Sequence, residues 1–256
     1  MPEKSLANPQ QDEIRSTLLR LRTEQERLFL QLRSGEQRFR QLARSVWRVQ
    51  EDERRRLARD LHDGIGQHLT ALRHRLDQLP CAPGAGHMLA EAVGLCDVAI
   101  RETRTLSRLL RPQVLDDFGL TAALGWLART AGESSRLQID VETHDIPADL
   151  DSELATLLFR VTQEALANVA KHAAAQTVVV SVDVRGDSIH LLVVDDGCGC
   201  DVDQALARSG AGLSTGIASM RERVLLFGGR FALVSEPGEG TQVRVSIPLP
   251  ERSESA

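Results

Sequence analysis

A histidine followed directly by a carboxylate stands in an arginine-rich segment that has the apolar periodicity of a helix. His62 precedes Asp63, and Gln67 lies four residues further, one turn along the same predicted helix face. Imidazole is neutral for much of its population near neutral pH and has a nucleophilic nitrogen. The carboxylate could accept the ring proton or fix the tautomer, and the amide could position a water. The alternative is an ordinary surface histidine on a charged helix.

A second polar group lies near the end of a predicted helix over 153–172. Glu164 and Asn168 are four residues apart, and oxygen ligands at this spacing suit a Mg²⁺ ion that keeps several waters and bridges phosphates. Lys171 and His172 follow a turn later. Only two of the 31 basic residues are lysines, so an ammonium retained here points to phosphate contact. The alternative is a plain polar helix face.

Glycine-rich turns form the third group of interest. They lie after a predicted strand at 195–199, before a predicted helix at 210–216 and between two predicted strands at 238–241. Glycine lets backbone amides approach phosphates, and a helix N-terminus favours an anion. Each turn alone is ordinary, and the G-x-x-x-x-G-K-[ST] pattern of a P-loop is absent from the sequence. The candidate residues in these turns are Asp195, Gly197, Gly199, Gly212, Gly216, Gly240 and Thr241.

Long helices must position the histidine. From Ile14 to Val49, apolar residues recur at alternating spacings of four and three, broken only at Gln25 and Gly35, and this pattern predicts a coiled coil. Beyond Val49 the apolar positions Leu57, Leu61 and Ile65 advance in steps of four. Such steps over-advance the apolar seam and locally relax a supercoil, as a stutter does. We hypothesise that this change of phase transmits rotation; the alternative is a simple packing irregularity.

A turn rich in proline and glycine at 80–86 ends this helix, and a second amphipathic series continues to Leu110. Two amphipathic helices joined by a short turn form a hairpin. One hairpin cannot bury both apolar stripes, whereas two hairpins make a four-helix bundle. The pattern therefore predicts a homodimer.

The second half of the chain has an α/β pattern. Helices are expected over 153–172 and 218–227, and strands over 177–185, 188–196, 230–235 and 241–249. Strands that pair as hairpins beside gathered helices predict a two-layer α+β sandwich.

Composition excludes several classes of function. The net charge is −5, aromatic residues make up 3% and tyrosine is absent, so no direct contact with nucleic acid is expected. No apolar run approaches the roughly 18 residues of a membrane span, and the first residues lack the apolar region of a secretory signal. The four cysteines lack zinc-ligand spacing. We therefore expect a cytoplasmic protein.

Together and in order, these segments resemble a bacterial two-component sensor histidine kinase. The specific likeness is to the subfamily that includes nitrate/nitrite sensors and the membrane-fluidity sensor of fatty-acid desaturation, with a GHKL-type ATP-binding domain. The likeness covers residues 46–250. It rests on ERRRLARDLHDGIGQ at 53–67, LRPQVLDDFGLTAAL at 110–124, QEALANVAKHA at 163–173, DxGxG at 195–199, GIASMRER at 216–223 and GEGT at 238–241.

The resemblance implies a role for each matching residue. His62 would be the phosphorylated nucleophile, Asp63 its acid/base partner, and Gln67 would serve the reverse phosphatase reaction. Asn168 would bind Mg²⁺ beside Glu164, which is counted among the catalytic residues. The resemblance assigns ATP binding to Lys171, His172 and Thr241, adenine recognition to Asp195, close approach of the nucleotide to Gly197 and Gly199, and the lid and phosphate loop to Gly212, Gly216 and Gly240. Which glycine of 210–216 contacts phosphate stays open.

The resemblance also implies a multidomain fold: a long coiled coil and an all-α hairpin, then the sandwich ATPase domain. The expected segments are a disordered tail at 1–13, a coiled-coil signalling helix at 14–50, a dimerisation and histidine phosphotransfer domain at 51–111, a linker at 112–135, an ATP-binding catalytic domain at 136–250 and a tail at 251–256. The expected partner is a response regulator with a receiver domain and a helix-turn-helix output domain. The alternatives are a GHKL-type ATPase and a non-catalytic signalling scaffold.

Overall fold

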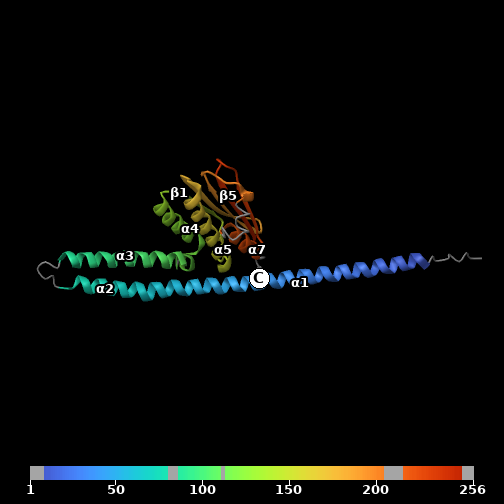
Figure 1. Ribbon diagram of the computed structural model, residues 1–256, viewed down its shortest axis with the longest axis horizontal. Coiled ribbons are helices and arrows are strands. Elements are labelled where there is room, and N and C mark those ends of the chain that lie inside the picture. Colours follow the sequence, from blue (N-terminus) through green and yellow to red (C-terminus); the bar gives the residue numbers. More distant parts are fainter. Residues whose placement is uncertain (1–8, 80–85, 111–112, 205–215, 250–256) are drawn as a thin grey trace, which may run out of the picture. The chain divides into compact units, whose positions relative to one another are not determined.

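A computed structural model describes residues 9–79, 86–110, 113–204 and 216–249 of the chain (Figure 1). The residues separate into two units, Met1–Trp47 and Arg48–Ala256. Helix α1 runs from Pro9 to Arg59, so it begins inside the segment that we expected to be a tail. None of the helices in the described residues combines the length and apolarity that crossing a lipid bilayer requires.

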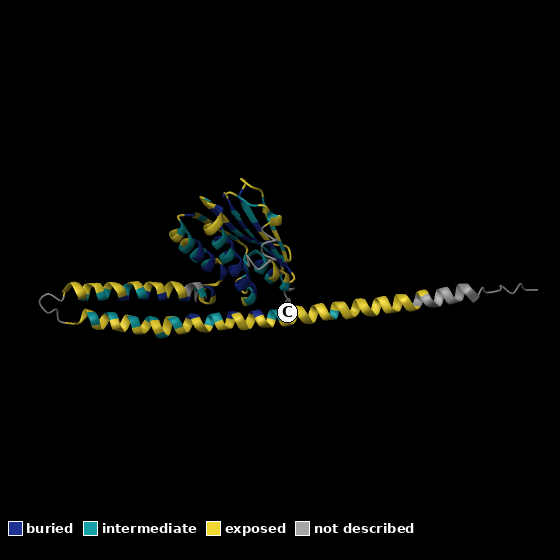
Figure 2. Cartoon of the chain, viewed as in Figure 1, coloured by how far each residue is buried: buried dark blue, intermediate teal, exposed yellow. Residues whose placement is uncertain are grey.

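The first unit consists of the N-terminal part of α1. Ion pairs one turn apart, such as Arg22–Glu26 and Arg40–Glu36, lie along its surface and support an exposed helix. Apolar residues of the predicted seam are exposed in the single chain, as Figure 2 shows for this part of the helix: Leu18, Leu21, Leu28, Leu32, Phe39, Leu42 and Val46. Coiled-coil pairing through this seam stays a prediction.

The second unit begins with a helical hairpin. After α1 come a π-helical turn η1 (Asp60–Gly66), helix α2 (Gln67–Asp77) and helix α3 (Gly86–Leu110). Both η1 and α2 pack against α3. Arg73 Nε lies 2.6 Å from Asp97 Oδ1, and Ser107 Oγ donates a 2.7 Å hydrogen bond to the carbonyl of Ala58. The hairpin is as expected, but the sequence pattern did not predict the π-helical turn.

Helix α4 (Gln113–Ser135) occupies the segment that we expected to be a linker. Its backbone breaks at Gly119, where φ is 76° and ψ is −174°. The apolar residues after the break are buried against α5 and β1: Leu120, Ala123, Leu124 and Leu127. Their spacing of three and four is the signal of an amphipathic helix. The segment therefore contributes to the core of the sandwich.

A five-stranded sheet forms one layer of the sandwich. Its strands are β1 (Gln138–His144), β2 (Thr177–Arg185), β3 (Ser188–Asp195), β4 (Arg230–Ser235) and β5 (Thr241–Pro248). The order is β1-β2-β3-β5-β4; β1 and β2 are parallel, and the other pairs are antiparallel. The four expected strands lie where they were predicted, to within one residue at their ends. Strand β1 was missed.

The second layer consists of α4, α5 (Ser152–Asn168) with its π-helical end η2 (Val169–Ala173), and α7 (Gly216–Leu226). These helices gather on one side of the sheet (Figure 1). The Asp151 side chain caps α5 by accepting hydrogen bonds from the amides of Glu153 and Leu154. Buried residues alternate along β2 and β3, as a sheet with one covered face requires. Leu157, Leu158 and Phe159 of α5 are fully buried as well. The predicted two-layer α+β sandwich is confirmed.

Candidate active site

His62 and Asp63 lie in η1, and Gln67 is the first residue of α2; all three side chains are exposed. His62 and Gln67 line one cavity of about 400 Å³ together with Thr103 and Arg104 of α3. Asp63 does not line it, although it follows His62 directly. Among the described residues, the imidazole makes no hydrogen bond or ion pair. A ring nitrogen of His62 is therefore available to an incoming reactant.

A second cavity, of about 460 Å³, opens at the end of α5 within the sandwich. Such a volume suits a small-molecule ligand. Apolar walls come from residues of β3, β4, β5 and α7: Val193, Leu233, Val243, Ile217 and Met220. The cavity brings together these residues that the sequence predicted: Asn168, His172, Asp195, Gly199 and Thr241. An apolar cavity with a few polar groups is the usual form of a small-molecule site.

Asp195 is the buried acid of this cavity and ends strand β3. Burial raises the pKa of its carboxyl above the ordinary value, because desolvation disfavours the charged form. Hydrogen bonds from the backbone amides of Gly197 and Thr241 act in the opposite direction, and the charge of Asp196 adds to the increase. The amide of Gly197 lies 3.0 Å from Asp195 Oδ1.

Asp196 has a structural role that was not predicted from the sequence. Its exposed carboxylate accepts hydrogen bonds from the amides of Gln176 and Thr177, at 2.8 Å and 2.9 Å, and from Thr177 Oγ1 at 2.7 Å. These bonds lower the pKa of Asp196. The residue ties the end of β3 to the start of β2 and so holds the loop beyond Asp195 in place.

Glycines allow three backbone segments to meet around Asp195. A Cβ on Gly199 would lie 2.0 Å from the carbonyl oxygen of Glu236, and one on Gly240 would lie 2.0 Å from that of Asp195. A Cβ on Gly197 would lie 2.4 Å from the carbonyl oxygen of Ala173. The resemblance implied close approach of the nucleotide at Gly197 and Gly199 and a place in the lid and phosphate loop for Gly240. In the structure, the group that approaches these three glycines is protein backbone.

Ser235 fastens the same turns and was not anticipated from the sequence. Its Oγ accepts a 2.8 Å hydrogen bond from the amide of Cys200 and donates a 2.7 Å bond to the carbonyl of Gly240. One hydroxyl thus connects the turn after β3 with the turn before β5. No local signal distinguishes this serine from an ordinary surface serine.

Glu164 lies against the first residue of α7. A Cβ on Gly216 would be 2.2 Å from Glu164 Oε1 and 3.5 Å from Asn168 Nδ2. Neither Glu164 nor Gly216 lines the cavity, and nor do Gly197 and Gly240.

Lys171 is exposed and does not line the cavity. Gly212 lies outside the described residues. In the part of the chain that the structure describes, no cluster of three or more histidine, cysteine, aspartate or glutamate side chains could hold a metal ion.

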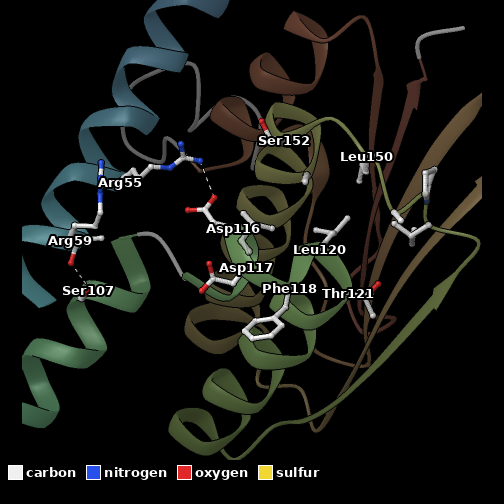
Figure 3. Close-up of a pocket in the computed structure, with 17 residues that line it drawn as sticks. Arg55, Arg59, Ser107, Asp116, Asp117, Phe118, Leu120, Thr121, Leu150 and Ser152 are labelled. Atoms are coloured by element: carbon white, nitrogen blue, oxygen red, sulfur yellow. Dashed lines mark hydrogen bonds and ion pairs between the residues drawn. The ribbon is translucent and has the colours of Figure 1, made fainter. Parts of the chain in front are cut away.

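A further cavity, of about 980 Å³, lies beside helices α1, α3 and α4 (Figure 3). It contains none of the predicted site residues. Arg55 and Arg59 of α1 face Asp116 and Phe118 of α4 across it, and Arg55 Nη2 lies 2.9 Å from Asp116 Oδ1 (Figure 3). Residues of both the hairpin and the sandwich line this cavity, so it lies where these two parts of the unit meet.

Comparison with known proteins agrees with this geometry. The family model described as histidine kinase matches residues 53–115. The model described as histidine kinase-, DNA gyrase B-, and HSP90-like ATPase matches residues 153–251. The first match contains His62 and the second contains the cavity around Asp195.

Among curated proteins, the sensor histidine kinase MctS of Rhizobium johnstonii is 35% identical over 227 residues, which are 86% of this chain and 48% of that protein. The sensor histidine kinase LiaS of Bacillus subtilis is 32% identical over 220 residues, 80% of this chain and 58% of that protein. The chain thus spans about half the length of these relatives.

Among solved structures, the histidine kinase domain from the Erythrobacter litoralis EL346 blue-light activated histidine kinase matches with 22% identity and a TM-score of 0.46, over 75% of this chain and 94% of that one. The two family models follow each other along the chain in the order of the helical hairpin and the ATP-binding sandwich. With the curated relatives, they show that the chain belongs to the family of two-component sensor histidine kinases.

Proposed function

We propose that the chain is an ATP-dependent protein-histidine autokinase that phosphorylates itself on His62. The observation that supports this most is an exposed imidazole that makes no hydrogen bond or ion pair with the described residues, in a chain that also has a cavity with a buried carboxylate in an ATPase-type domain. A nucleophile and a nucleotide site are the two parts that such a reaction requires.

In the proposed reaction, a ring nitrogen of His62 attacks the γ-phosphorus of ATP. The new N–P bond forms as the bond to the bridging oxygen breaks, and ADP leaves. The ring proton passes to Asp63, which directly follows the histidine. The phosphorylated histidine then donates its phosphoryl group to an aspartate in the receiver domain of a response regulator, which we expect to have a helix-turn-helix output domain.

We assign adenine recognition to Asp195, because a buried carboxylate at the end of a strand can accept a hydrogen bond from an exocyclic amino group. Gly199, His172 and Thr241 line the cavity around it. Gly197, Gly216 and Gly240 shape the backbone next to it, and Lys171 is assigned to the phosphates. Gly212 keeps its predicted role in the lid as an expectation.

Mg²⁺ fits the oxygen donors of this site, because Asn168 reaches the cavity and Glu164 lies one turn before it on α5. The described residues contain no cluster of three or more protein ligands for a metal. Mg²⁺ is commonly held by one or two protein groups together with phosphates and water. Bound there, the ion would neutralise charge that develops on the phosphates. Gln67, which shares a cavity with His62, is assigned to positioning water in the reverse phosphatase reaction.

The test is incubation with γ-labelled ATP. We expect acid-labile label on the protein, its loss in His62→Gln, and a nucleotide affinity within about twofold of the unmodified protein, because the two cavities share no residue. His68→Gln, an exposed histidine six residues away, is the matched control and should keep the label. Free phosphate without labelled protein would support a simple ATPase instead. Label that persists in His62→Gln would refute the assignment of the nucleophile.

A further inference from the structure

Two thiols lie on either side of Gly199, in the loop that follows β3. Cys198 and Cys200 are both free, and Cys198 is exposed whereas Cys200 is partly buried. Cys200 also lines the cavity that contains Asp195. The proposed phosphoryl transfer uses neither thiol. One sulfur open to solvent beside another in the wall of a ligand site is an arrangement that suits thiol–disulfide chemistry.

The backbone keeps these two cysteines close to each other. Two successive Cα–Cα steps of about 3.8 Å limit the separation of the Cα atoms of Cys198 and Cys200 to about 7.6 Å, and a bend between them shortens it. Gly199 provides such a bend, because its φ is 61°. A disulfide requires Cα atoms about 4.4–6.8 Å apart. A bond between the two sulfurs is therefore within reach of a small movement of the loop.

Only weak contacts hold the exposed thiol where it is. Cys198 Sγ lies 3.4 Å from the carbonyl oxygen of His172, and a thiol is a weak hydrogen-bond donor. The backbone of Cys198 is fixed more firmly, since its amide donates a 2.7 Å hydrogen bond to the carbonyl of Ala173 and its carbonyl accepts one of 2.7 Å from the amide of Gly238. We therefore expect the backbone at Cys200 to supply most of the movement.

The backbone of Cys200 is connected to the nucleotide cavity through Ser235. The amide of Cys200 donates a 2.8 Å hydrogen bond to Ser235 Oγ, which donates a 2.7 Å bond to the carbonyl of Gly240. Ser235 Oγ also lies 3.1 Å from Thr241 Oγ1, and the amide of Thr241 donates a hydrogen bond to the carboxylate of Asp195. A shift at Cys200 therefore reaches the residue assigned to adenine through a short chain of hydrogen bonds.

We propose that Cys198 and Cys200 form a redox-sensitive thiol pair, and that its disulfide closes the nucleotide cavity to ATP. This inference rests on the proposed ATP site. The bond would draw Cys200 out of the cavity wall and away from Ser235, and so release the turn that holds Thr241 against Asp195. A ring closed over a single intervening residue is strained, so the disulfide is readily reduced again. The closure is therefore reversible.

The oxidant is a low-molecular-weight disulfide, RSSR. The thiolate of the exposed Cys198 attacks one of its sulfurs; a mixed disulfide forms as the RS–SR bond breaks, and RS⁻ leaves. The thiolate of Cys200 then attacks the sulfur of Cys198, and the second RS⁻ leaves. The two cysteine protons pass to the leaving thiolates, so that two cysteines are oxidised and RSSR is reduced to two RSH.

The test uses the full chain with its two other cysteines replaced, Cys81→Ser with Cys96→Ala, so that the pair holds the only thiols. Oxidised glutathione is the probe. We expect the protein to lose the mass of two hydrogen atoms and to retain no glutathione. We expect its affinity for ATP to fall about tenfold, because the form that can bind becomes a minor one, and dithiothreitol to restore it. ATP added beforehand should slow the reaction, since it occupies the cavity that Cys200 lines.

Two single variants of that protein separate the roles of the thiols. Cys200→Ser should retain one glutathione on Cys198, because the resolving thiol is gone. Cys198→Ser should react about tenfold more slowly, because its remaining thiol is partly buried. A glutathione that stays on the intact pair, a disulfide between two chains, or an unchanged affinity for ATP after the pair has closed would each overturn the proposal.

The reduced protein provides a separate check of the proposed function. Reduced protein that binds ATP without labelling His62 contradicts the autokinase assignment and leaves the thiol pair to be judged by ATP affinity. Reduced protein that binds no ATP contradicts the nucleotide site and with it the closure of that site by the disulfide.

Discussion

At the scale of single residues, the chemistry depends on charges that burial has altered. Asp195 occupies a position where desolvation raises its pKa, although two backbone amides partly compensate. A group with a raised pKa in the folded protein stabilises the fold at low pH and loses this contribution as the pH rises through that pKa. Near neutral pH the ligand-free protein therefore bears a cost for this carboxylate, which a hydrogen-bond donor on a ligand would offset.

Asp195→Asn tests this trade-off. We expect the ligand-free variant to melt at the same temperature as the unmodified protein or slightly higher near neutral pH, because the desolvated charge is gone. We also expect the increase in melting temperature on adding ATP to disappear. In the unmodified protein that increase should weaken as the pH falls from about 7 towards about 4, since the neutral carboxyl of protonated Asp195 accepts a weaker hydrogen bond from adenine than the carboxylate does. Thermal-shift measurements across this range check both points, and an unchanged ATP response in the variant would contradict the assignment.

At the scale of elements, contacts between backbone segments determine the shape of the turns around Asp195. Gly199 has a φ of 61°, and its missing Cβ leaves room for the carbonyl of Glu236 in the β4–β5 turn. Gly240 has the same relation to Asp195. These turns close on each other without side chains between them, so their shape cannot adapt to a larger residue.

Gly199→Ala should therefore destabilise the ATP-binding domain by more than the strain of positive φ alone. That strain costs about 1–2 kcal/mol, and the clash with backbone adds about 1–3 kcal/mol. Gly186→Ala is the matched control, because Gly186 has a φ of 58° in the β2–β3 turn and open space at its Cβ. Urea denaturation of both variants measures the difference. Equal losses of stability in the two variants would show that the backbone around Gly199 can move to make room for a methyl group.

Most of the helices and strands could be predicted from the sequence, because the spacing of apolar residues reflects which side chains of an element are buried. Alternating valines located β2, and turns with glycine located both hairpins. Strand β1 was missed because its seven residues, QIDVETH, include few apolar ones, and α4 was expected to be a linker. The buried ion pair between Glu51 of α1 and Arg160 of α5 leaves no local pattern, since its partners are 109 residues apart. Pairings at that distance follow from the tertiary fold.

At the scale of the whole molecule, the hairpin exposes apolar residues that a single chain cannot cover. Leu72 of α2 is 48% exposed, and Leu95 and Leu106 of α3 are 66% and 55% exposed. An exposed apolar stripe along both helices of a hairpin is what a four-helix bundle would bury. The expected homodimer accounts for these residues.

Leu72→Glu combined with Leu106→Glu should convert the dimer to a monomer, because buried carboxylates would face each other across the bundle. Light scattering should give twice 28.1 kDa for the unmodified protein and 28.1 kDa for the variant. Gln78→Glu, which adds charge at the exposed residue that follows the last residue of α2, should stay dimeric. A monomeric unmodified protein at micromolar concentration would contradict the expectation.

The π-helical turn η1 around His62 has one further consequence. Hydrogen bonds there skip one residue more than in the helices on either side. Such a turn accommodates one extra residue within a continuous helix. We expect that a twist applied to α1 would change the direction of the His62 imidazole at this turn before it altered the pairing of α2 with α3.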